Sequence, residues 1–106
     1  MSKYLFTGSF TATGDLGVEH EGGSKRRAVV DKLFTSLGGK LESYHFAFGA
    51  DDFVVIGELP SNAAAAAASL ATSATGAVHT RTVVLLTPEE VDAATKLSPN
   101  YRPPGR

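Results

Sequence analysis

Three side chains of this sequence are candidates for a catalytic role, and each lies in or beside a predicted strand. His45 lies within a strand, Asp52 ends the turn that follows it, and Arg81 lies in a later strand. Imidazole exchanges protons near neutral pH, and a carboxylate can act as a general base. Each residue also has a structural explanation, such as a hydrogen bond within an interface or to nearby turn amides. Their spacing fixes no contact between them, so their role stays open.

A second candidate site lies where a helix is predicted to begin. The segment 24–27, SKRR, directly follows Gly22–Gly23. Free backbone amides at a helix start, with positive charge nearby, can hold an anion. The segment lacks the GxxxxGK[ST] pattern of a phosphate-binding loop, and a solvated basic patch is the simpler explanation. We take Ser24, Arg26 and Arg27 as candidate ligand-binding residues.

Several kinds of site are excluded or disfavoured by residue type. The chain has no cysteine, which excludes disulfides, thiolate nucleophiles and zinc–cysteine sites. His20, His45 and His79 are far apart and show no metal-binding spacing. Neither a GxSxG motif nor a dinucleotide-binding fingerprint occurs. The sequence therefore predicts no metal and no cofactor.

Size and charge set the class of protein. A chain of 106 residues is long enough for one small domain, here residues 1–106 with an extended, proline-rich tail at 98–106. The net charge is -1 with dispersed Lys and Arg, which disfavours a nucleic-acid partner. No segment is apolar enough to cross a membrane, and the N-terminus lacks the features of a secretory signal. We expect a cytoplasmic protein with no membrane partner.

The pattern of apolar residues and glycines predicts alternating strands and helices. Val30, Leu33, Phe34 and Leu37 form one apolar stripe of a helix. A long glycine-containing loop is expected over Ala12–Gly23, with at most a short helical turn, and its length marks it as a place to look for function. The predicted strands are Lys3–Thr11, Lys40–Phe48, Phe53–Leu59 and Val78–Leu86, and the predicted helices span 24–37, 62–75 and 88–97, the second anchored by Leu70.

This order, β-α-β-β-α-β with an additional C-terminal helix, predicts an α+β ferredoxin-like fold. Helices would cover one face of the sheet. Phe53 and Val55 alternate with Val54 and Ile56, so both faces are apolar. We therefore expect the uncovered face to pack against a second copy, giving a homodimer or higher homo-oligomer of the dimeric α+β barrel type. In the alternative, the last helix or the tail covers that face within the same chain.

Segments along nearly the whole chain resemble the GYD-domain family of small bacterial proteins, whose function is not established. The resemblance rests on KYLFTGSFT, EGGSKRR, LGGKLESYHFAFGADDFVVIGELP, the alanine-rich helix and VVLLTPEEVDAA. Gly49 and Asp52 match the Gly and Asp of the pattern that gives the family its name, whereas Asp51 replaces its Tyr. The resemblance implies a ferredoxin-like fold and self-association, and it implies no defined activity.

The sequence leaves three functions open, and fold class alone does not choose among them. The first is a small oligomeric module that binds a small molecule or another protein. The second is a cofactor-independent dimeric α+β barrel enzyme, oxygenase- or isomerase-like, acting on a hydrophobic or aromatic small molecule through His45, Asp52 and Arg81. The third is a purely structural subunit. Whether the chain is an enzyme is not decided at this stage.

Overall fold

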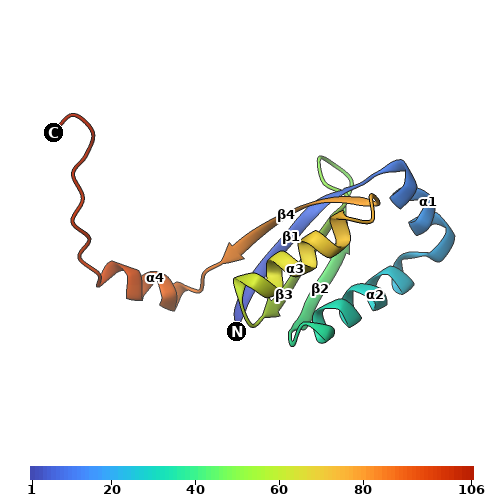
Figure 1. Ribbon diagram of the computed structural model, residues 1–106, viewed down its shortest axis with the longest axis horizontal. Coiled ribbons are helices and arrows are strands. Elements are labelled where there is room, and N and C mark those ends of the chain that lie inside the picture. Colours follow the sequence, from blue (N-terminus) through green and yellow to red (C-terminus); the bar gives the residue numbers. More distant parts are fainter.

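The computed structural model describes residues 1–106 and contains one four-stranded antiparallel sheet with the strand order β2-β3-β1-β4. This is the ferredoxin-like α+β fold that the order of elements predicts (Figure 1). Its elements are β1 (Ser2–Phe10), α1 (Ala12–Glu21), α2 (Gly23–Ser36), β2 (Lys40–Phe46), β3 (Phe53–Leu59), α3 (Asn62–Ser73), β4 (Val78–Leu85) and α4 (Pro88–Thr95).

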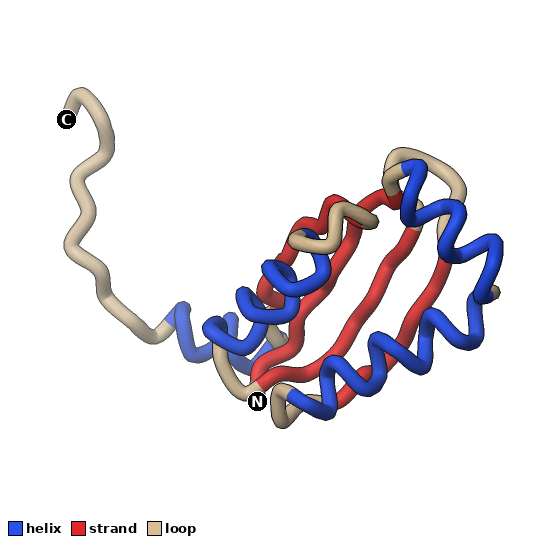
Figure 2. Tube along the Cα trace, turned by 45° about the vertical axis from the view of Figure 1, so that its right-hand side comes forward, coloured by secondary structure: helices blue, strands red, loops and turns tan.

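Helices α2 and α3 cover the same face of the sheet, which we call the helical face (Figure 2). Strand residues of one parity point to this face, because successive side chains of a strand alternate. Tyr4, Phe34 and Leu59 are at most 2% exposed there, and the ring of Phe6 meets that of Phe34 edge-on at 5.6 Å. Each such side chain stabilises the fold by about 1.5–3 kcal/mol. The helical face therefore holds the core of the domain.

The segment after β1 is helical, and the loop expected over Ala12–Gly23 is wrong. The hydroxyl of Thr11 accepts a hydrogen bond from the backbone N–H of Gly14, which caps the start of α1. Gly22 ends the helix with a φ of 84°, a conformation that glycine adopts without strain. The glycines within this segment lower helix propensity but do not prevent a capped helix that packs on its neighbours.

Helix α3 packs through alanines and not through a large side chain. Ala65 and Ala68 are buried against the sheet, whereas Leu70 is 71% exposed. The expectation that Leu70 anchors this helix is therefore wrong. Ser61 caps its start by accepting from the N–H of Ala64. Because its buried side chains are small, α3 lies close to the strands beneath it.

The hairpin between β2 and β3 is shorter in its strands and longer in its turn than the sequence suggests. β2 ends at Phe46, and Phe48 is fully exposed in the connecting loop. The loop spans residues 47–52, because the N–H of Ala47 donates to the carbonyl oxygen of Asp52 at 2.8 Å and closes it. The predicted strand end at Phe48 is therefore wrong by two residues.

The second face of the sheet, which we call the open face, has no helix over it. The pairing of the strands places Ser43, Ile56, Leu5 and Val83 in one row across this face. Charged residues, among them Lys3 and Glu42 with a 3.0 Å ion pair, border this row toward one end of the strands. The open face is thus an apolar centre with a polar border.

The segment from Leu86 to Arg106, which we call the C-terminal arm, projects away from the domain (Figure 1). It contains α4, whose start is the predicted capping box: Thr87 and Glu90 exchange side-chain and backbone hydrogen bonds. The arm leaves the open face bare, contrary to the alternative in which it covers that face. It raises the radius of gyration to 16.9 Å, against about 13 Å for a compact domain of this size.

Candidate functional site

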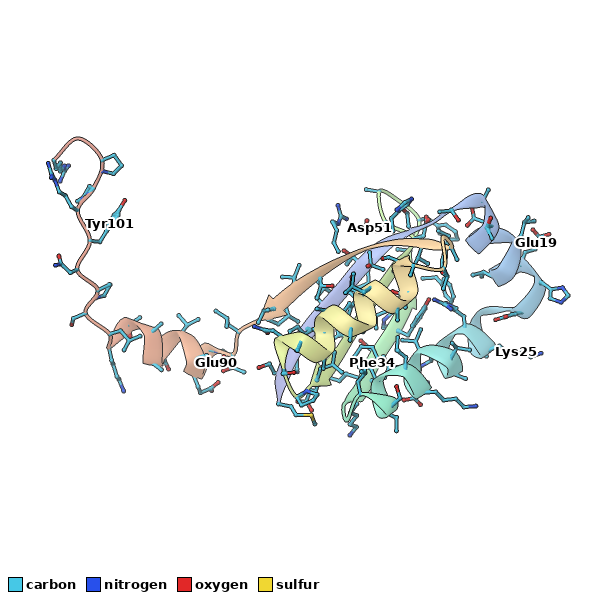
Figure 3. All side chains as sticks on the ribbon, viewed as in Figure 1. Glu19, Lys25, Phe34, Asp51, Glu90 and Tyr101 are labelled. Carbon is cyan, nitrogen blue, oxygen red and sulfur yellow. The ribbon has the colours of Figure 1, made fainter.

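A groove lies on the helical face, between α2 and α3. Helix α2 packs on β2 and β3, whereas α3 packs on β3 and β4. The strands between the two helices form the floor of an opening of about 40 Å³. Its walls and floor are mostly apolar, and they are formed by Phe6, Arg26, Val30, Leu33, Phe34, Tyr44, Phe53, Val55, Ala68, Thr72, Val78 and Thr80. Figure 3 shows Phe34 on α2 at this position. A concave apolar site with few polar groups is typical of small-molecule binding.

Arg26 is the charged residue of the groove, and one of its donors is unused. Its Nε–H is buried and has no hydrogen-bond acceptor. No carboxylate lines the groove, and neither ion pair of the structure involves Arg26. A buried donor without an acceptor costs about 1–3 kcal/mol, and more when the group is charged. The Nε–H of Arg26 is therefore free to donate to a hydrogen-bond acceptor or an anion in the groove.

Tyr44 is the polar neighbour of Arg26 on the groove floor. Burial raises the pKa of the Tyr44 hydroxyl above its ordinary value of 10.0, and the positive charge of Arg26 opposes this rise. The hydroxyl is therefore protonated across the neutral range and can donate or accept a hydrogen bond. The two threonines of the groove are already bonded: Thr72 to carbonyl oxygens of α3, and Thr80 to Ser69 at 2.9 Å. Arg26 also lies close enough to Tyr44 to donate to its oxygen, so the Nε–H of Arg26 is the donor that remains for a ligand.

Glycine at the start of α2 lets this end of the helix pack closely on an aromatic ring. A Cβ at Gly23 would lie 2.9 Å from the ring of Phe46, so only glycine lets this end of the helix rest on that ring. Phe46 belongs to an aromatic cluster in which it lies 5.1 Å from Tyr44 and 6.3 Å from Phe10, centroid to centroid. Gly23 therefore permits an aromatic contact at the start of α2, three residues before Arg26.

A second, larger cavity of about 250 Å³ adjoins the groove and shares Arg26 and Val78 with it. It lies between α1, the start of α2 and the chain that leads into β4, and is lined by Phe10, Thr13, Gly14, Gly17, Val18, Glu21, Arg26, Thr75, Ala77 and Val78. Arg26 thus stands at the junction of a narrow apolar groove and a wider, more polar space. A ligand at Arg26 can extend into both.

The other two residues predicted at this helix start lie outside the groove. Ser24 and Arg27 are exposed, and neither lines either cavity. The N-cap of α2 is Gly22 and not Ser24, and no side chain caps this helix. Of the three candidate ligand-binding residues, the structure brings only Arg26 to an enclosed site.

The candidate catalytic residues His45 and Arg81 lie on the open face, at opposite edges of the sheet. His45 of β2 pairs with Val54 of β3, and Val54 pairs with Thr7 of β1. Thr7 pairs in turn with Arg81 of β4, so two strands separate His45 from Arg81. Three strand spacings correspond to roughly 14 Å. The structure therefore does not bring these two side chains together, and neither lines the groove of the helical face.

Asp51 and Asp52, adjacent in sequence, have separate contacts. The Oδ2 of Asp52 accepts from the N–H of Phe10 at 2.9 Å, and its own N–H donates to the carbonyl oxygen of Gly8 at 2.7 Å. Both oxygens of Asp51 accept from Nη2 of Arg81, at 2.5 and 2.6 Å. Asp52 ties the loop to β1, and Asp51 ties it to β4. No group of three or more His, Asp or Glu side chains is placed to hold a metal ion.

Tyr44 is the site residue that sequence reasoning missed. The alternation in β2 sets Tyr44 opposite His45, so its placement on the helical face follows from the pattern. The sequence places Tyr44 on the same side of β2 as the helices and places Arg26 at the start of one of them. Whether Tyr44 and Arg26 meet depends on the angle at which α2 crosses β2. That crossing is not encoded in local spacing.

The sheet order and helical cover define an α+β domain of the ferredoxin-like class. Within that class, the model of the GYD domain matches residues 4–95, and the chain belongs to the GYD family. Searches of curated proteins and of solved structures find no match. None of the helices has the length and apolar character needed to cross a membrane.

Proposed function

We propose that this protein is a binding module for a small, mainly apolar molecule that carries an acidic group. The observation that carries the proposal is the buried Nε–H of Arg26, which has no acceptor in a groove with mostly apolar walls. A carboxylate would supply that acceptor and would pair with a guanidinium that makes no ion pair in the structure. Arginine suits this role because its planar guanidinium matches the geometry of a carboxylate.

The dimensions of the site limit the ligand. The groove volume of about 40 Å³ exceeds the space that one water needs but excludes a large ring system. We propose a ligand with a short alkyl chain in this narrow groove, its acidic group at Arg26 and any further polar part in the adjoining cavity of about 250 Å³. The Tyr44 hydroxyl, which stays protonated at neutral pH, can donate a second hydrogen bond to the acid.

Calorimetric titration of the full chain with hexanoate, and with its neutral isostere hexanamide, tests the proposal. We expect hexanoate to bind and hexanamide to bind at least about tenfold more weakly, because a hydrogen bond between charged groups contributes about 1.5–3 kcal/mol. Arg26→Gln should remove this preference. Arg27→Gln is the matched control, since Arg27 is exposed and outside the groove. Equal affinity for acid and amide would overturn the proposed ligand class.

Self-association through the open face is the second proposal, and it is supported by a separate observation. Val83 is 46% exposed on that face, and it lies in a row with Leu5 and Ile56 that no element of the chain covers. A contiguous apolar patch on a sheet marks an interaction site. Two copies related by a two-fold axis would bury the same patch on each. Val83→Asp should then shift the mass in solution toward the monomer.

The enzyme alternative receives no support from the positions of its residues. A cofactor-independent dimeric α+β barrel enzyme acting through His45, Asp52 and Arg81 requires them around one substrate. His45 and Arg81 lie at opposite sheet edges, and the Asp52 carboxylate bonds to the backbone of Phe10. We therefore propose binding, and not catalysis, as the function of the domain.

A further inference from the structure

The cavity of about 250 Å³ beside the groove has charges of opposite sign on two of its walls. Glu21 is the last residue of α1, and Arg26 lies in the first turn of α2. Both residues line the cavity, and neither takes part in an ion pair of the structure. The cavity therefore has one positive and one negative group that do not neutralise each other.

The two helix ends at this cavity reinforce the side-chain charges. Gly22 is both the C-cap of α1 and the N-cap of α2, and no side chain caps α2. The last carbonyl oxygens of a helix give its end a partial negative charge, and the first N–H groups give its start a partial positive charge. Glu21 and Arg26 each have the same sign as the helix end that bears them. This arrangement is unfavourable within each helix, and it favours a ligand that carries both charges.

The face of α1 that lines the cavity is built from small residues. Gly14, Gly17, Val18 and Glu21 recur at the spacing of one helical face, and all four line the cavity. A Cβ at Gly14 would lie 2.1 Å from the carbonyl oxygen of Ala77, so glycine permits a close approach there. A Cβ at Gly17 would meet nothing within 4 Å. Gly17 thus adds no side chain to the cavity, which leaves room for a polar group between the two charges.

We propose that the ligand of this site is an apolar α-amino acid. The inference rests on the proposed function and adds to it a second polar group of the ligand. The carboxylate accepts from the Nε–H of Arg26, which lines both the groove and the cavity. The α-ammonium, a donor of three hydrogen bonds, lies in the cavity toward Glu21, and the apolar side chain occupies the groove. One α-carbon bears all three groups, as the meeting of these two spaces at Arg26 requires.

Calorimetric titration of the full chain at pH 7 with hexanoate and with 2-aminohexanoate tests the inference, because the two acids differ in the α-ammonium alone. We expect 2-aminohexanoate to bind about fivefold more tightly, as an ion pair with an exposed carboxylate at a helix end allows. Glu21→Gln should remove this difference between the two ligands. Glu19→Gln is the matched control, since Glu19 is exposed on the same helix and lines neither the groove nor the cavity (Figure 3).

The outcomes separate this inference from the proposed function. Hexanoate that binds through Arg26, with no gain in affinity from the α-ammonium, would overturn the amino-acid inference and leave the proposed function intact. A gain that persists in Glu21→Gln, or that Glu19→Gln also removes, would overturn the position given to the ammonium. Failure of both acids to bind, or binding of both that Arg26→Gln leaves unchanged, would overturn the proposed function and this inference together.

Discussion

The helical face and the open face of the sheet are built from the same strands, yet they meet different environments. On the helical face Tyr4, Phe6 and Phe34 are buried by helices of the same chain. On the open face, alternate residues of those strands, such as Leu5 and Ile56, have no cover. The comparison shows how a two-sided apolar strand pattern divides the work. One face holds the core of the monomer and encloses a groove, and the other is uncovered and is the face that we propose packs against a second copy.

The largest expected difference between the faces is in stability. Phe34→Ala removes a 2% exposed ring from the core and should lower the free energy of unfolding by about 3–5 kcal/mol. Leu5→Ala on the open face should cost less than half of this at concentrations where the chain is monomeric. Urea denaturation measures both. Similar losses for the two variants would break the distinction between the faces.

Glycine on the helical face gives the next test. A Cβ at Gly57 would lie 2.3 Å from the ring of Phe34, so Gly57→Ala should destabilise the fold by about 1–3 kcal/mol through overpacking. Gly49→Ala is the control, because a Cβ there meets nothing within 4 Å. Thermal unfolding of the two variants compares them directly. An unchanged Gly57→Ala would show that α2 does not press on the sheet as described.

The paired aspartates of the hairpin loop should differ in a smaller way. Asp52→Ala removes the acceptor of the Phe10 N–H and should cost about 1.5–3 kcal/mol, since the bond involves a charged group. Asp51→Ala breaks an ion pair in which Arg81 is 68% exposed, and should cost no more than about 1 kcal/mol. Chemical denaturation at neutral pH measures the difference. Equal costs would contradict the anchoring role given to Asp52.

The smallest expected effect is a shift in the titration of Tyr44. Burial holds its pKa above 10.0 and Arg26 partly opposes this, so Arg26→Gln should raise the pKa further. Because the folded-state pKa exceeds the unfolded one, the associated stability is complete below pH 10 and falls as the pH rises through the folded value. Ultraviolet titration of tyrosinate measures the pKa, with Tyr44→Phe to assign the signal. A lower pKa in Arg26→Gln would remove Arg26 from the vicinity of Tyr44.

Local patterns in the sequence predict much of this fold because the forces involved are local. The stripe that includes Val30 and Phe34 gives α2 its buried side, and the Thr87–Glu90 capping box marks the start of α4. Helix α1 is not predicted from such patterns, because Gly14 and Gly17 lower the helix propensity of this segment. Gly14 is required there for a tertiary reason: a Cβ would lie 2.1 Å from the carbonyl oxygen of Ala77.

The candidate site was predictable in part only. Arg26 follows from the basic segment at a helix start, but its unmet donor depends on the separation of α2 and α3 across the sheet. Leu70 illustrates the same limit, since helical spacing does not tell which side of an alanine-rich helix meets the strands. The arrangement of His45 and Arg81 depends on strand order, which places the edge strands β2 and β4 apart.

NMR shift mapping of the full chain during titration with hexanoate tests most directly whether the ligand binds on the helical face and not on the open face. We expect shift changes around Arg26, Val30, Tyr44 and Val78 on the helical face, and none at Leu5, at Ile56 or on the C-terminal arm. Arg26→Gln should abolish the changes at the same ligand concentration. Shifts centred on the open face or the arm, or shifts that persist unchanged in Arg26→Gln, would contradict ligand binding in the groove of the helical face.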